Sequence, residues 1–121
     1  MKVKVKVILR NRVVLPEGAV CRVELRDESM VDGPAGIVAS YEEPVKEVSG
    51  IDLMACTLEG DDDAFAGRDV NVWAHLSLTG EKQVRVGDFI TMQAYPVGGV
   101  GSAKAAGSAK AVTVELQPVS S

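Results

Sequence analysis

Residues 2–9 decide the fold class, and they read Lys2-Val3-Lys4-Val5-Lys6-Val7-Ile8-Leu9. Charged and apolar side chains alternate in this stretch as far as Val7. Successive side chains of a β-strand point to opposite faces of a sheet. The period of two therefore predicts a strand whose valines share one face and whose lysines share the other.

The same alternation recurs along the chain. Turn residues such as Pro16-Glu17-Gly18 and Asp32-Gly33-Pro34 separate the alternating stretches, and no segment of ten or more residues shows a helical period. We therefore predict an all-β protein, a single β-sandwich of seven or eight mostly antiparallel strands. The further strands are expected at residues 20–27, 36–43, 51–58, 70–78, 82–86, 88–95 and 111–117.

Length and composition fit one domain spanning residues 1–121. The chain has 121 residues, of which 46% are hydrophobic and 25% charged, as is typical of globular proteins. No apolar run approaches the roughly 18 residues that a membrane-spanning helix needs, so no direct membrane insertion is expected. Residues 98–109 are rich in Gly, Ala, Ser and Lys, which predicts a flexible loop.

Charge is distributed unevenly along the chain. Residues 1–26 hold seven Lys/Arg and two Asp/Glu, whereas residues 27–63 hold one lysine and eleven Asp/Glu. Such a layout can steer a charged partner. The net charge of −4 and the lack of aromatics in the basic segment argue against nucleic-acid binding. As the terminal strand, residues 2–9 are expected at a sheet edge, where lysines oppose pairing and favour a monomer, with a weak charge-driven dimer as the alternative.

Nothing in the sequence supports catalysis, a metal site or a cofactor. The single histidine, His75, excludes a His-pair zinc site, and no nucleophile motif of the GxSxG type is present. Asp61-Asp62-Asp63 lack the spacing of a calcium loop and are interpreted as a solvated turn. Cys21 and Cys56 fall on the apolar phase of their strands, which predicts reduced thiols at least partly buried in the core.

The stretch 70–78 carries the candidate binding face. Asn71, Trp73 and His75 alternate with apolar residues and so share one, mostly polar, side of the expected strand. An outward tryptophan is a candidate for protein contact or for stacking on a sugar. The alternative is that a neighbouring loop or strand covers the indole.

Two parts of the chain resemble a known family. Arg10-Asn11-Arg12-Val13-Val14-Leu15-Pro16-Glu17-Gly18-Ala19-Val20 precedes Val23-Glu24-Leu25-Arg26-Asp27, and Tyr95-Pro96-Val97 follows a predicted strand. This resembles the YbaY/YscW-type family of bacterial lipoproteins. The resemblance implies a small all-β domain without enzymatic activity. It also implies an assembly-assisting role toward a secretin, as in the pilotin-like branch.

We therefore expect a non-catalytic domain that binds or helps to assemble a protein partner, secretin-like if pilotin function holds. A carbohydrate- or other small-ligand-binding module that uses Trp73, His75 and Asn71 is the alternative hypothesis. The printed sequence begins without a signal peptide or lipobox. It is thus expected to be cytoplasmic as it stands, or periplasmic and tethered to the outer membrane if the native protein has a longer N-terminus.

Overall fold

The computed structural model describes residues 2–28, 36–45, 52–60, 69–97 and 109–120. Every regular element in these ranges is a β-strand, which confirms the all-β class. The strands are β1 (Lys2–Leu9), β2 (Val20–Asp27), β3 (Gly36–Pro44), β4 (Asp52–Glu59), β5 (Val70–Ser77), β6 (Phe89–Ile90) and β7 (Ala109–Pro118). The described ranges contain no helix that is long and apolar enough to cross a bilayer.

The alternation in β1 determines which of its side chains enter the core, as predicted. Val3, Val5, Val7 and Leu9 are buried, whereas the lysines between them are exposed. The same phase buries Cys21, Val23 and Leu25 on β2 and the apolar side chains of β5. These side chains meet in one cluster whose other members come from β4, β7 and three irregular segments, among them Ala19, Val45, Leu58, Val97, Val114 and Leu116.

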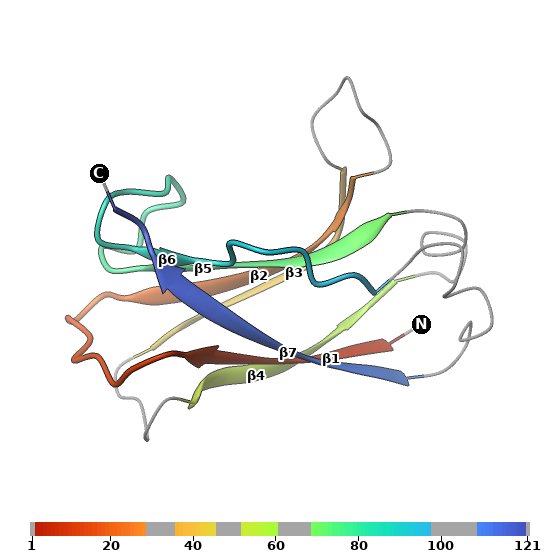
Figure 1. The fold of residues 1–121 in the computed structure, drawn as a ribbon, viewed down its shortest axis with the longest axis horizontal. Coiled ribbons are helices and arrows are strands. Elements are labelled where there is room, and N and C mark those ends of the chain that lie inside the picture. Colours follow the sequence, from red (N-terminus) through yellow and green to blue (C-terminus); the bar gives the residue numbers. More distant parts are fainter. Residues whose placement is uncertain (1, 29–35, 46–51, 61–68, 98–108, 121) are drawn as a thin grey trace.

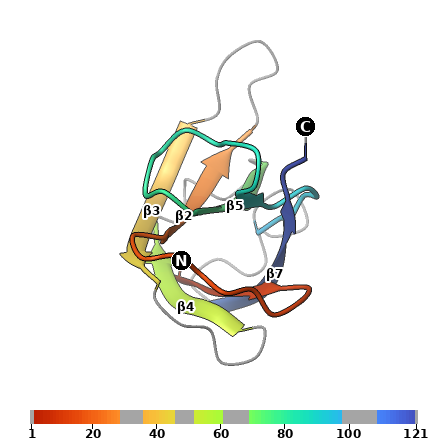
Figure 2. The same cartoon turned by 90° about the vertical axis from the view of Figure 1, so that its left-hand side faces the viewer.

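The seven strands form one continuous sheet in the order β3-β2-β5-β6-β7-β1-β4. All pairs are antiparallel except β1 with β7. In Figure 1, β7 starts in the layer of β1 and β4 and ends beside β6 in the layer of β5, β2 and β3. Seen end-on, the strands surround the core (Figure 2). The sheet is thus nearly closed and barrel-like. A two-sheet sandwich is not what the structure shows, because β7 joins the two layers.

The placement of residues 2–9 at a sheet edge was wrong. β1 lies between β7 and β4 and pairs with both along its length. The edges are instead β3 and β4. Lys2, Lys4 and Lys6 therefore stand on the outer face of an interior strand, where they do not protect an edge.

Two predicted strands differ from the structure. Residues 82–86 form no strand, and within 88–95 only β6, Phe89–Ile90, is regular. Gly80 and Gly87 have positive φ values of 83° and 97°, which turn the chain before and after residues 82–86. Beyond β6, the chain bonds to β5 again through Tyr95 O and Val97 N but loops out at residues 92–94. Alternation alone could not reveal these turns.

The predicted flexible loop 98–109 lies outside the described residues, apart from Ala109, which begins β7.

Candidate functional site

The outer side of β2 and β5 brings the predicted face into a larger polar cluster. Residues directly opposite each other on antiparallel strands point to the same side of the sheet. The register of β2 with β5 therefore places three residues of β2 beside the three candidates of β5, in the pairs Arg22 with His75, Glu24 with Trp73, and Arg26 with Asn71.

Trp73 is half-buried under two guanidinium groups. The Cζ of Arg26 lies 3.8 Å from the centroid of the indole, and that of Arg22 lies 5.3 Å away. Both are in the range of cation–π attraction. Glu24 holds both cations, because its Oε1 accepts a hydrogen bond of 2.8 Å from Arg26 Nε and its Oε2 forms an ion pair of 3.4 Å with Arg22 Nε. One face of the indole is thus occupied by Arg26, an arrangement that stiffens the surface around it.

His75 is not accessible from this side. Only 1% of the residue is exposed, because the segment 79–88 crosses over it, held in part by a 2.9 Å hydrogen bond from Arg22 Nη2 to Lys82 O. The expectation that His75 shares an open binding face with Trp73 is therefore corrected. The physical reason is the covering segment, whose path depends on glycines and on Asp88 rather than on strand alternation.

Asp88 anchors the covering segment from the inside. Its Oδ2 lies 2.9 Å from His75 Nε2 and accepts a 3.0 Å bond from Arg85 N, and its Oδ1 accepts a 3.1 Å bond from Leu78 N. Burial by itself raises the pKa of this carboxyl. The hydrogen bonds from His75, Leu78 and Arg85 outweigh that effect and lower the pKa below its ordinary value of 3.8.

The His75–Asp88 pair has a structural role. Arg22 Nη2 lies 3.5 Å from His75 Nδ1. A guanidinium only donates hydrogen bonds, so in the neutral ring this contact leaves Nδ1 as the acceptor and Nε2 as the donor to Asp88. Both ring nitrogens thus face protein groups, and the ring is shut off from solvent. Neither nitrogen is free to serve as an acid or base for a substrate.

Two hollows on the outer surface border the cluster of Arg22, Glu24 and Trp73. One has a volume of about 540 Å³ and is lined by residues of β2 and β3 that include Ile37 and Tyr41, together with Lys82. The other, of about 270 Å³, is lined by Asn71, Trp73 and the looped-out residues 92–94. Ile37 is 59% exposed and Met92 49%. We call the surface formed by Arg22, Arg26, Ile37, Trp73 and Met92 the Trp73 face.

The sequence did not reveal Ile37 and Met92 as surface residues. Ile37 is placed opposite Arg26 by a register shift after Leu25, so that it lies on the outer side. Met92 is exposed because three residues loop out between Thr91 and Tyr95, both of which bond to β5. Register shifts and looped-out residues depend on the pairing of strands that are distant in the sequence. A local sequence pattern therefore does not predict them.

The two thiols lie away from this surface. Cys21 is buried and Cys56 is half-buried, as expected, and both are free. Burial, with smaller contributions from Cys56 and Glu43, raises the pKa of Cys21 to about 12. Burial and then Glu43 raise that of Cys56 to about 11. Thiols with such pKa values are protonated near neutral pH and are therefore poor nucleophiles and metal ligands.

Across the part of the chain that the structure describes, no three His, Cys, Asp or Glu residues are grouped to hold a metal ion.

Comparison with known proteins identifies the family. The model of the family described as type III secretion system lipoprotein chaperone (YscW) matches residues 1–105. The chain belongs to the YscW family. The YscW family is one of secretion chaperones, which act in protein assembly and not in catalysis. No curated protein matches the chain.

A solved structure shares the fold of this YscW family member. It is an alternative pilotin from the type II secretion system of Vibrio cholerae, with 24% sequence identity and a TM-score of 0.75. The match covers 100% of this chain and 98% of the pilotin chain. The barrel-like arrangement of strands therefore recurs in a pilotin of the type II secretion system.

Proposed function

We propose that this domain is a non-catalytic assembly factor that binds a secretin-type subunit through the Trp73 face. The match of the YscW family model to residues 1–105 supports the role in assembly, since that family is described as a secretion chaperone. The fold shared with a type II secretion pilotin supports the same class of partner.

The composition of the Trp73 face supports its choice as the contact surface. Tryptophan and arginine dominate the energetic centres of protein interfaces, and methionine is enriched there. Here Trp73 is stacked with Arg26 and flanked by the exposed side chains of Ile37 and Met92. A rigid aromatic centre with apolar rims costs little conformational entropy when a partner covers it.

The geometry around Trp73 does not support the alternative of a carbohydrate-binding site. A sugar would stack on an open aromatic face beside polar side chains, but Arg26 covers one face of the indole and His75 is buried. Asn71 is half-buried and opposes Arg26. Protein contact is therefore the better use of this surface.

The test measures binding of the purified domain to the purified secretin of the same organism by calorimetry. We expect Ile37→Asp and Met92→Asp each to weaken binding by about tenfold or more, the effect of removing a central contact. Val14→Asp is the matched control, because Val14 is 96% exposed in the segment between β1 and β2, outside the Trp73 face. It should change the affinity less than about twofold.

Equal losses in all three variants would show that the added charge and not the Trp73 face matters, and the choice of surface would be wrong. Thermal unfolding of each variant checks that the fold is intact. Absence of any binding by the wild-type domain would contradict the proposed function itself.

A further inference from the structure

A second surface, on the opposite layer, is built around the lysines of β1. Lys4 is flanked by Thr57 of β4 and Ala111 of β7, and Lys6 is flanked by Ala55 and Thr113. Partners in register share a face, so all six side chains lie on the outer side of the sheet. They surround a hollow of about 430 Å³.

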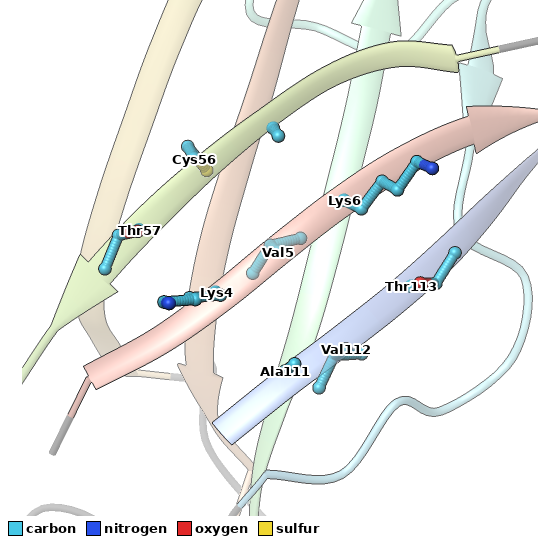
Figure 3. A pocket seen from close by; sticks show the side chains of 9 residues that line it. Lys4, Val5, Lys6, Cys56, Thr57, Ala111, Val112 and Thr113 are labelled. Atoms are coloured by element: carbon cyan, nitrogen blue, oxygen red, sulfur yellow. The ribbon is translucent and has the colours of Figure 1, made fainter. Parts of the chain in front are cut away.

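The side chains of the two lysines leave the hollow open. In Figure 3 they extend in opposite directions along β1, and the smaller side chains from β4 and β7 lie on either side. Small neighbours cannot fill the space beside a long lysine. The result is a shallow depression with one ammonium group toward each end, within the size range of ligand sites.

The charges at the two ends are not neutralised equally. Lys6 Nζ lies 3.4 Å from Asp52 Oδ1, an exposed pair. Among the residues that the structure describes, Lys4 forms no ion pair. A cation without a partner beside an unfilled depression favours a ligand that carries carboxylates.

We infer that this depression, the Lys4 hollow, seats an acidic segment of a partner protein in an extended conformation. Lys4 and Lys6 are two residues apart on one strand, about 6.6 Å along its axis, and because their side chains extend in opposite directions, their ammonium groups lie farther apart than this (Figure 3). An extended segment that lies along β1 and carries a carboxylate at every second residue can place one carboxylate near each ammonium group.

The chemistry of the Lys4 hollow favours a protein ligand over other polyanions. Recognition of anionic membranes typically uses clusters of four to eight Lys/Arg. Single-stranded nucleic acids are bound with stacking aromatics, and the residues that line the hollow include none. Two cations above small, partly apolar side chains suit a short acidic peptide. The inference concerns a different face and does not rest on the Trp73 face or on a secretin.

The test uses a labelled octapeptide of alternating glutamate and threonine, with fluorescence anisotropy at low salt as the readout. We expect Lys4→Glu to weaken binding about fivefold or more, and Lys4→Arg to preserve it within about twofold. Arg12→Glu is the matched control for charge, because Arg12 is exposed in the segment after β1. It should change the affinity less than about twofold. Raising the salt from about 0.03 M to about 0.3 M should abolish most of the binding.

A second pair of variants tests the hollow itself. Ala111→Tyr fills the depression without changing charge and should reduce binding about as much as Lys4→Glu, whereas Val14→Tyr should not. Equal effects of Lys4→Glu and Arg12→Glu, or no effect of Ala111→Tyr, would overturn the inference. So would tighter binding, sensitive to Lys4→Glu, of vesicles with anionic lipids or of an oligothymidylate, because either would name another class of ligand.

Discussion

Replacement of Asp88 by asparagine is expected to lower the free energy of unfolding by about 2–3 kcal/mol. The carboxylate is buried and accepts hydrogen bonds from three donors, His75 Nε2, Arg85 N and Leu78 N. An asparagine offers one acceptor oxygen and turns an amide N–H₂ toward donors that then lack a partner. Urea unfolding followed by circular dichroism measures the loss.

Asp52→Asn is the matched control, because Asp52 is exposed and its ion pair with Lys6 is a surface pair. Its effect should stay within about 0.5 kcal/mol. A loss for Asp88→Asn no larger than that would show that the buried network contributes little, and the account of the covering segment would be wrong.

Comparison of the wild-type protein with Asp88→Asn also predicts how the free energy of unfolding depends on pH. The pKa of Asp88 is lower in the folded protein than its ordinary value of 3.8. The ionised carboxyl therefore stabilises the fold above about pH 4, and this stabilisation is lost as the pH falls through the lowered pKa. The gap in stability between wild type and Asp88→Asn should thus narrow as the pH falls below about pH 4.

Gly80→Ala is expected to destabilise the domain by about 2–4 kcal/mol, and more than Gly87→Ala. Both glycines have positive φ, which costs an alanine about 1–2 kcal/mol. At Gly87 the added Cβ meets open space, whereas at Gly80 it would lie 3.0 Å from Gly18 O. That carbonyl cannot retreat easily, because the next residue, Ala19, is buried and its oxygen accepts a 2.9 Å bond from Val45 N.

The difference between the two glycine variants isolates the close approach of two loops. Thermal unfolding of both, under the same conditions, measures it. Equal losses would mean that the turn around Gly18 yields, and that only backbone strain matters at Gly80. A larger loss at Gly87 would contradict the described packing.

Alternation in the sequence predicted most of the strands because apolar residues stand at every second position wherever a strand turns one side to the core. β1 follows this rule closely, and on β2 and β5 the inward residues form the core as expected, although Glu24, His75 and Ser77 on their outer sides are buried as well. The rule says nothing of which strands are neighbours. For that reason β1 was placed at an edge, and the link that β7 makes between the two layers was missed.

The candidate site was only partly predictable for the same reason. The period of two correctly placed Asn71, Trp73 and His75 on one side of β5. What covers them comes from far along the chain, namely Arg22 and Arg26 across the sheet and the segment fixed by Asp88. Register and loop paths determine whether an outward side chain is open or covered, and both depend on tertiary pairing.

The amount of assembled secretin in cells measures the proposed assembly role. Secretin multimers are quantified by native gel electrophoresis in the source organism with and without the gene for this chain. We predict that multimers fall severalfold without it and return with the wild-type gene or with Val14→Asp. They should not return with the Ile37→Asp/Met92→Asp double variant. Full assembly of the secretin in cells that lack the gene would contradict the account.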